Sequence, residues 1–441
     1  MERTVPASHA VAWPGTSRLL PWCLAGISVM LWLAPFDAMQ LPISLPVDAK
    51  LDRFALGLTL ALWLLVVVSG STGRPRPRPS VVGAALLVWL GAITVSIIVN
   101  LPQLTQAGEL SGAVKAASLA LSFAALFLIV ATTLRADEVG PLLTLNLALA
   151  CITAIGVVVQ FRTGTNYFFK VAGAIPGLQV GSPPVSTQPG ARADITGPTG
   201  HGLAVGTMMG MVVPLAMGRL LVARRWSQRA LYAVAVALLL IGCVSTQRRT
   251  ALIVPVICLV VLALYRPRRI VRLLPLGVVL VVVMQLAAPG AISGLRYQFS
   301  NTGTDASSQG RSSDYPAVQP DVMSHLLFGR GYGAYDASKY RFLDNQVLGS
   351  LITSGLLGLL AYLALVLAVF FVGHRLARES GTRGIMGAAV ASASVGYLIC
   401  NVLFDTLAFR PVTYVLMLLA GCAVALHAGD EGQRFSAPAR R

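Results

Sequence analysis

The sequence predicts an all-α membrane protein that crosses the bilayer about twelve times. Of its 441 residues, 56% are Ala, Val, Ile, Leu, Met, Phe, Trp, Tyr or Cys, and only 12% are charged. Soluble domains are nearer 45–50% apolar and about 25% charged. Apolar runs of about 20 residues recur along the chain, and that length crosses a hydrocarbon layer of about 30 Å. The composition therefore excludes a soluble enzyme, and we expect a single transmembrane domain over residues 1–441.

Twelve apolar runs are candidate spans. The first begins at Leu19, and no convincing small-residue cleavage site follows it, so we expect a retained helix and not a removed signal peptide. The seventh, eighth and ninth runs are the short ones. The candidate spans are 19–36, 54–71, 81–99, 115–134, 140–160, 202–222, 230–246, 250–265, 273–288, 347–373, 385–404 and 412–428.

Arginines gather in the short loops on one side of the predicted membrane. If the N-terminus is cytoplasmic, the arginine-rich segments 72–80, 219–229 and 266–272 all face the cytoplasm. The cytoplasmic segments together hold 20 Lys and Arg against 6 Asp and Glu, whereas the rest of the chain holds 14 against 11. Short cytoplasmic loops with this bias follow the positive-inside rule. The net charge of +17 therefore indicates topology and not nucleic-acid binding, and we expect both termini in the cytoplasm of a multi-pass protein.

Two of the predicted extracytoplasmic segments are long. The first, 161–201, is rich in Gly, Pro and polar residues, and the second, 289–346, lies just before the tenth span. Long loops inside a compact protein are usually functional or disordered. The second loop contains aromatic residues and Gly-rich turns, so we expect it to fold, with a short helix near 312–327.

Arg248 and Arg249 oppose the charge rule. They lie at the outer end of the seventh span, directly before the eighth. Charged groups near membrane depth usually face a cavity and mark a substrate path, and guanidinium forks suit phosphate oxygens. The alternative is that both side chains only extend to lipid headgroups.

An anionic ligand at the outer face would explain several other outer cations. Such single loop arginines are otherwise solvated or paired with carboxylates. The candidates for ligand binding among them are Arg192, Arg296, Arg311 and Arg330.

Polar residues next to two predicted spans are further candidates. Asp344 and Asn345 precede the tenth span, where a carboxylate is either a helix cap or a base at the mouth of a membrane cavity. His201 opens the sixth span and is a candidate for lining that cavity. His325 lies at the end of an apolar stretch, where a structural role competes with substrate binding.

Neither a metal site nor a bound cofactor is expected. The six cysteines all lie in apolar runs without a CxxC pair or a neighbouring His cluster. The acidic residues of the outer loops do not have EF-hand spacing either.

Three stretches of the sequence resemble the O-antigen ligase and polymerase family of bacterial membrane glycan transferases. Ser-Thr-Gln-Arg248-Arg249-Thr is similar to its Ser-x-Ser-Arg motif. Gly-Arg311-Ser-Ser-Asp-Tyr, followed by Phe-Gly-Arg-Gly-Tyr-Gly at 328–333, is similar to its loop signature. Asp344-Asn345-Gln-Val-Leu, entering a Ser-Gly-Leu-Leu-Gly helix, resembles its His/Asp-Asn-x-x-Leu motif.

The resemblance implies a GT-C-like helical fold with metal-independent glycan transfer outside the cytoplasm of a bacterial inner membrane. The donor would be a glycan on undecaprenyl or another polyprenyl pyrophosphate. Residues at the positions of Arg249 and Arg311 would hold the pyrophosphate, with Arg248 nearby, and Asp344 would be the general base. Many ligases have His at the position of Asp344, so the acceptor, a glycan or a glycolipid, is left open between ligase and polymerase.

A transporter or flippase of lipid-linked saccharide is the alternative class of function. Twelve spans suit a transporter, but transporters usually place charges or broken helices near the bilayer midplane. In this sequence the spans are nearly free of charge, and the polar residues gather in the outer loops.

Overall fold

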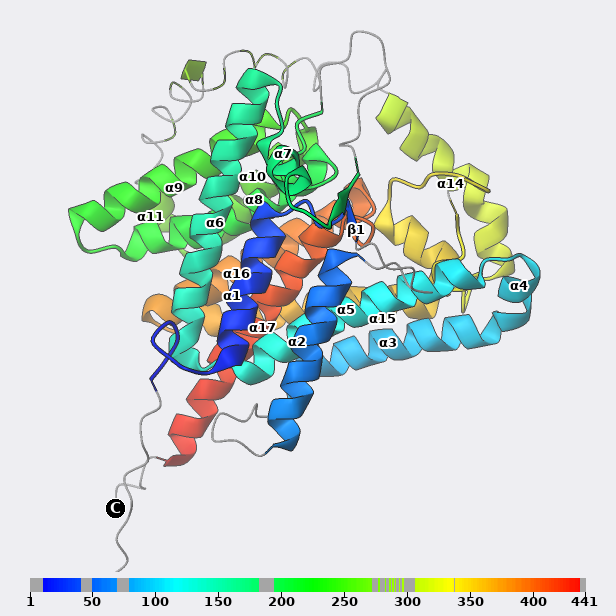
Figure 1. The fold of residues 1–441 in the computed structure, drawn as a ribbon, viewed down its shortest axis with the longest axis horizontal. Helices are drawn as coiled ribbons and strands as arrows, with labels where there is room; N and C mark the ends of the chain where they lie inside the picture. The colour runs from blue at the N-terminus through cyan, green and yellow to red at the C-terminus, as the bar shows by residue number, and fades with distance from the viewer. Residues whose placement is uncertain are drawn as a thin grey trace, which may run out of the picture.

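The computed structural model describes residues 11–40, 50–69, 79–181, 194–271, 306–336 and 338–436, together with isolated positions between 277 and 296. Helices make up nearly all of the regular structure in these residues (Figure 1). A single two-stranded ribbon joins β1 (Met39–Gln40) to β2 (Gln179–Val180) in antiparallel register, with Met39 opposite Val180. The predicted all-helical class is therefore confirmed.

Most helices agree with the predicted spans. Nine are long and apolar enough to cross a membrane within the described part of the chain: α2 (Leu51–Val68), α3 (Val81–Val99), α5 (Leu110–Thr133), α6 (Ala136–Thr163), α8 (Gly202–Val222), α9 (Trp226–Ser245), α15 (Gln346–Ala377), α16 (Gly381–Leu403) and α17 (Arg410–Ser436). Two shorter apolar helices, α1 (Leu19–Leu33) and α10 (Arg249–Tyr265), match the first and eighth predicted spans. The ninth predicted span, 273–288, falls mostly outside the described residues, so the count of twelve stays a prediction.

The remaining helices are short or lie in the predicted loops. The short helices are α4 (Leu101–Gln106), α7 (Tyr167–Gly173) and α11 (Pro267–Val271). Helix α14 (Ala306–Ser324) lies in the long loop where a helix near 312–327 was predicted, and begins several residues earlier than expected.

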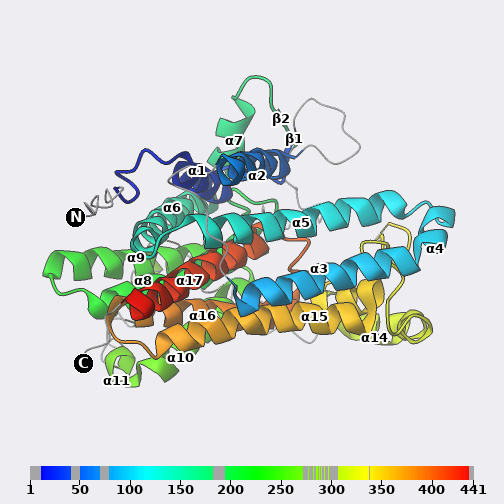
Figure 2. The same cartoon turned by 90° about the horizontal axis from the view of Figure 1, so that it is seen from below.

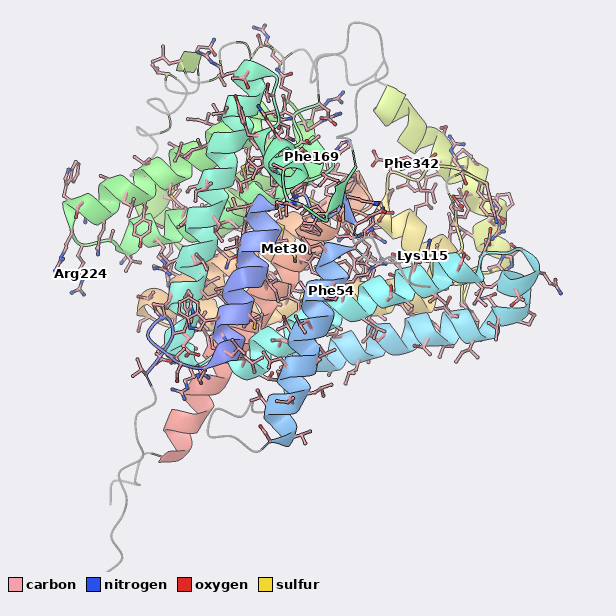
Figure 3. The ribbon with its side chains drawn as sticks, viewed as in Figure 1. Met30, Phe54, Lys115, Phe169, Arg224 and Phe342 are labelled. Carbon is pink, nitrogen blue, oxygen red and sulfur yellow. The ribbon has the colours of Figure 1, made fainter. Side chains whose placement is uncertain are left out.

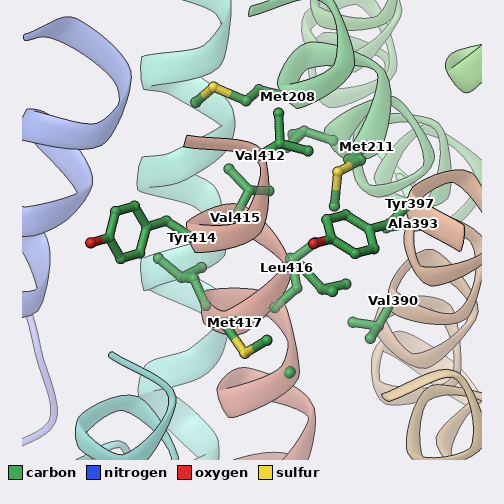
Figure 4. Close-up of a cluster of buried hydrophobic side chains, with 14 of the residues drawn as sticks. Met208, Met211, Val390, Ala393, Tyr397, Val412, Tyr414, Val415, Leu416 and Met417 are labelled. Carbon is green, nitrogen blue, oxygen red and sulfur yellow. The ribbon is translucent and has the colours of Figure 1, made fainter. Parts of the chain in front are cut away.

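Helices α8, α16 and α17 form the centre of the bundle. The apolar parts of these three helices are more buried than those of the other six long helices. Figure 4 shows Val412 and Leu416 of α17 among buried side chains of the neighbouring helices, such as Met208, Met211 and Tyr397. Close approach depends on small residues, as is common between membrane helices. At Gly206, for example, an added Cβ would lie only 2.2 Å from the Cβ of Ala251 on α10. In contrast, α2 and α3 expose most of their apolar surface, which suits contact with lipid.

Two segments of the predicted inner loops and two of the predicted outer loops lie at opposite ends of the bundle. Figures 1 and 2 both show α11 and the α8–α9 turn at the left, whereas α4 and α14 lie at the right. In Figure 3, Arg224 marks the left end and Phe342 lies close to α14. This separation is what the charge pattern predicts. We call the end with α14 the outer end; which side of the membrane it faces stays a prediction.

The outer end depends on a break in α15. Gly355 has a φ of 68° inside the helix, and the segment 326–331 docks against this break. The Leu356 amide donates to the Leu326 carbonyl at 2.8 Å, and the Arg330 amide donates to the Ile352 carbonyl at 2.9 Å. These bonds pair backbone groups that the break would otherwise leave without partners. Residues 356–377 then form a helix of about 33 Å, which is close to the thickness of a hydrocarbon core.

We predict that Gly355→Ala strongly destabilises the protein. The combination of φ 68° and ψ −170° is essentially restricted to glycine, and it costs a residue with a side chain about 1–3 kcal/mol. The added Cβ would also lie 2.3 Å from the Leu327 carbonyl oxygen. The matched control is Gly349→Ala in the same helix, because no atom lies within 4 Å of a Cβ there. Thermal unfolding in detergent should show a clear loss of stability for the Gly355 variant and no loss for the control. Equal melting temperatures would contradict this explanation of the break.

Candidate functional site

Asp194 joins two of the chain segments that meet at the outer end. Its carboxylate lies 2.9 Å from the Arg248 guanidinium, which belongs to the α9–α10 turn. It also lies 3.9 Å from Nε2 of His201, the residue directly before α8. The Arg248 side chain is 40% exposed, so one part of its guanidinium is held while another remains accessible. Residues 194–201 are thus fixed beside the turn that carries both candidate arginines.

The α9–α10 turn is tight and places two arginines at the start of a helix. Gln247 has a φ of 55°, an uncommon conformation for a residue with a side chain. Arg248 is the N-cap of α10 and Arg249 its first residue, half-buried. Cations are unfavourable at the positive end of a helix, whereas an anion bound there is stabilised by the helix and by both guanidinium groups. The turn is therefore suited to a phosphate-bearing ligand.

His201 is held in one orientation. Its Nδ1 accepts a hydrogen bond from the Leu203 amide at 3.2 Å, so the side chain caps α8. Its ring centroid lies 5.3 Å from that of Phe409 in the α16–α17 loop. Burial lowers the pKa of His201, Arg248 lowers it further, and the nearby carboxylates of Asp194 and Asp344 oppose this shift. His201 is therefore mainly neutral at pH 7, and Asp344 lies within electrostatic range of it.

The structure separates the roles of Asp344 and Asn345. Asn345 caps α15, because its side-chain oxygen accepts from the Leu348 amide at 3.2 Å. Its amide nitrogen donates to the Tyr315 hydroxyl at 3.0 Å, and the residue is buried. Asp344 is half-buried and does not cap the helix. The capping alternative considered for Asp344 thus applies to its neighbour, while a substrate-binding role for Asn345 stays a prediction.

Asp405 is a carboxylate at the site that the sequence analysis did not select. It lies in the α16–α17 loop and accepts from the Ala408 amide at 3.0 Å. Burial raises the pKa of Asp405 to about 6, and the nearby Asp344 contributes to this increase. The loop is fixed to the start of α15, since the Leu407 amide donates to the Gln346 side chain at 2.8 Å. The signal that indicated Arg248, an outer cation that opposes the charge rule, does not apply to a carboxylate. The weaker signal that could have indicated Asp405 is a charge in a short outer turn between two nearly uncharged spans.

Two predicted binding residues lie in the connection between α14 and α15. The Arg330 guanidinium lies 3.2 Å from the Asp321 carboxylate and 4.3 Å from the centre of the Tyr340 ring. Nδ1 of His325 lies 2.8 Å from the Ser324 hydroxyl. Asp321 and Ser324 belong to α14, so these contacts join the connection to the end of that helix, and a role in substrate binding stays a prediction for both residues.

The other predicted cations are less well defined. Arg296 is exposed, and Arg192 lies outside the described residues. Arg311 belongs to α14 by its backbone, while its side chain falls outside the described part of the structure. Helix α14 packs against α15, which brings the backbone of the Arg311 segment to the same end of the bundle as Asp344.

A second charged cluster joins the first two helices to the last one. Arg410, the first residue of α17, lies 3.6 Å from the Asp37 carboxylate and 3.9 Å from the Asp52 carboxylate. The Tyr414 hydroxyl donates to Asp52 at 2.9 Å, and Asp52 is fully buried. Burial raises the pKa of Asp37 to about 6, against the effect of the Arg410 charge. Because Arg410 follows Phe409, this cluster also fixes the ring that lies beside His201.

Within the described residues, no group of three or more His, Cys, Asp and Glu is arranged to hold a metal ion. The metal-independent mechanism is not tested by this finding and stays a prediction. All six cysteines are free thiols.

Fold and site together define a multi-pass helical membrane protein with an arginine-bearing polar site at one end of its bundle. The O-antigen ligase family model matches residues 234–363, from α9 to the middle of α15. This segment of the chain is therefore similar to the O-antigen ligase family, as the sequence predicted, and it contains the motifs around Arg249, Arg311 and Asp344. This family implies a glycosyltransferase-like enzyme that acts on lipid-linked glycans in a membrane. No curated protein matches the chain.

We predict that Arg410→Met destabilises the protein by about 3–5 kcal/mol. The substitution removes the arginine that lies beside the buried Asp52 and the half-buried Asp37, and removing one partner is the costly way to break a buried ion pair. Arg410→Lys should recover part of the loss, since it keeps the charge. The control is Arg224→Met on the exposed α8–α9 turn, where we expect a change within about 0.5 kcal/mol. Equilibrium unfolding in detergent gives the comparison, and similar stabilities for Arg410→Met and the wild type would show that the cluster contributes little.

Proposed function

We propose that this protein transfers an oligo- or polysaccharide from a polyprenyl-pyrophosphate donor to a sugar hydroxyl at the outer face of a bacterial cytoplasmic membrane. The observation that carries the proposal is the convergence of Arg248, His201 and Asp344 at one end of the bundle, inside and beside the matched family domain. The charge pattern of the loops supports an extracytoplasmic site and cytoplasmic termini. The GT-C-like fold class belongs to this proposal.

The donor pyrophosphate binds at the α9–α10 turn. Arg249 and Arg311 contact its oxygens, Arg248 lies beside them, and the start of α10 adds its positive end. A polyprenyl carrier needs a site open to lipid for its tail and to water for its glycan, which an outer end of a helix bundle supplies. The arginines neutralise the charge that develops on the leaving pyrophosphate, so no divalent cation is needed.

The reaction is a single displacement at the anomeric carbon of the donor sugar. The acceptor hydroxyl oxygen attacks that carbon, and the bond from the carbon to the pyrophosphate oxygen breaks. The hydroxyl proton passes to the Asp344 carboxylate, and the polyprenyl pyrophosphate leaves with the bonding electron pair. Attack from the side opposite the leaving group inverts the configuration. His201, neutral at pH 7, orients the acceptor from the other side of the site. The acceptor is a lipid-linked glycan for a polymerase or a glycolipid for a ligase.

A transfer assay with purified protein tests the proposal and its metal independence. In detergent, without any gradient, the protein should release the polyprenyl pyrophosphate from its glycan in step with formation of a longer or newly attached glycan. A transporter or flippase, the alternative function, would release no carrier under these conditions. We expect the same rate in chelator. No release with a range of acceptors would contradict the transferase, while loss of activity in chelator that Mg²⁺ or Mn²⁺ restores would contradict the metal-free mechanism alone.

Arg249→Lys should reduce transfer although it preserves the charge. A lysine cannot form the two parallel hydrogen bonds that a guanidinium gives to phosphate, and loss of one such donor typically costs about 10²-fold or more in rate. Arg162→Lys is the control, because Arg162 is exposed on the same predicted side. The measurement is the turnover rate at saturating donor, together with the donor concentration at half-maximal rate. Wild-type values for Arg249→Lys would remove Arg249 from the pyrophosphate site.

Asp344→Asn should lower transfer by about 10²-fold or more while donor binding persists, since the amide keeps the shape but not the basicity. Asp336→Asn is the control, an exposed carboxylate on the same outer connection.

In the wild type, transfer should fall as the pH drops through about 6. Asp405, whose pKa is raised to about 6, gains a proton there, and the site loses a negative charge that stabilises the transferred proton. Asp405→Asn should abolish this step in the pH profile. Unchanged turnover in Asp344→Asn would show that another group is the base.

A further inference from the structure

Two groups of arginines lie at the end of the bundle opposite the candidate site. The first group is on one hairpin, the α8–α9 turn, and consists of Arg224, Arg225 and Arg229. The second group comes from two segments far apart in the sequence, the α10–α11 connection and the end of α15. It consists of Arg266, Arg268, Arg269, Arg375 and Arg378. Glu379 is the single acidic residue in the segments 265–271 and 374–384 that carry the second group.

Contacts hold the two segments of the second group together. The Tyr265 hydroxyl at the end of α10 lies 2.7 Å from Nδ1 of His374 on α15. The Arg266 guanidinium is directed toward the Ala377 carbonyl at the end of α15, at 3.5 Å. Arg378 lies close enough to Tyr265 to influence its hydroxyl electrostatically. Arg266 and Arg378 therefore lie beside the same contact between α10 and α15, and Arg268, Arg269 and Arg375 are exposed on the two segments that it joins. The arginines of the first group follow a single exposed turn.

Exposed apolar stripes lead from the membrane region to the second group. On α10, Val256, Val260 and Leu264 are 50%, 56% and 77% exposed, and their spacing of four residues puts them on one face. On α15, Leu367 and Phe371 are exposed in the same way, and Arg375 continues their stripe one turn further on. Helix α16 is buried behind both helices and packs against each of them. Such a surface offers acyl chains an apolar face that ends in cationic side chains.

We propose that Arg266, Arg268, Arg269, Arg375 and Arg378 bind the phosphate headgroup of an anionic phospholipid in the leaflet opposite the active site. Basic residues between helices at a membrane surface are suited to such headgroups, and guanidinium groups bind phosphate oxygens in pairs. The acyl chains lie along the stripes on α10 and α15. The bound lipid thereby screens the repulsion among five neighbouring cations and fastens α15, which carries the site at its other end, to α10.

The positive-inside rule alone predicts a different behaviour. If the arginines serve only to orient the chain, both groups attract anionic lipid diffusely, and each arginine contributes to a similar extent wherever it lies at this end. A headgroup site built from two segments predicts instead that the second group retains lipid and the first does not. The first group is therefore an internal control at the same end of the bundle, and removing three arginines from either group removes the same charge.

The test is lipid retention by the purified full-length protein in native mass spectrometry, after titration with phosphatidylglycerol or phosphatidylcholine. The site variant is Arg268→Gln, Arg375→Gln and Arg378→Gln combined, and the control variant is Arg224→Gln, Arg225→Gln and Arg229→Gln combined. We expect the wild type and the control to retain phosphatidylglycerol but not phosphatidylcholine. The site variant should bind it about tenfold more weakly or worse. If either triple variant fails to insert, Arg378→Gln and Arg224→Gln alone give the same comparison with a shift of a few fold.

Three results would overturn the proposal. The first is equal retention by the wild type and the site variant. The second is an equal loss in the site and control variants, which would show diffuse attraction. The third is complete displacement of the lipid by millimolar inorganic phosphate, which would show that a free anion is the ligand. These measurements do not use transfer activity, so their outcome is independent of the proposed transferase function.

Discussion

A hydrocarbon layer about 30 Å thick accommodates almost no charge, and this constraint determines where chemistry can occur in the chain. Each ionisable group buried within it costs several kcal/mol unless it is paired. The central helices α8, α16 and α17 therefore pack through small and apolar side chains. The charged groups gather at the two ends: the arginines of the α8–α9 turn and of α11 lie at one end, and the arginine–carboxylate pairs of the candidate site and His201 lie at the other. An enzyme on this scaffold must assemble its site from helix ends.

Helix ends from distant parts of the sequence must then be held together, and the outer end shows how this is done. Backbone hydrogen bonds across the break at Gly355 fix the connection from α14 to the start of α15. The Gln346 side chain fixes the α16–α17 loop to the same place. Arg410 joins that loop to the first two helices through Asp37 and Asp52. These hydrogen bonds and ion pairs position Asp344, Asp405 and Phe409. Asp194 positions His201 and Arg248, since it contacts both side chains.

The spans could be predicted from the sequence because apolar length is a local property. Eleven of the twelve predicted spans correspond to described helices, and the residues at their ends differ by a few positions. The arginines of the α9–α10 turn were also predictable, because a cation on the outer side breaks the charge rule. The partners of these residues were not predictable. Asp194 and Arg248 are 54 positions apart, and nothing in the local pattern indicates that they form an ion pair. The break at Gly355 likewise depends on the docking of 326–331, a tertiary contact that hydropathy does not show.

The central claim, that the donor pyrophosphate binds between the α9–α10 turn and Asp344, is tested most directly by a structure with the lipid carrier bound. Cryo-electron microscopy of the protein in lipid nanodiscs with polyprenyl pyrophosphate would locate both phosphates. The account predicts them within about 3 Å of the Arg249 guanidinium, a typical distance for a charged hydrogen bond, with Asp344 facing the position of the departed sugar. Phosphates bound at the opposite end of the bundle, or at the outer end without contact to Arg248 or Arg249, would contradict it.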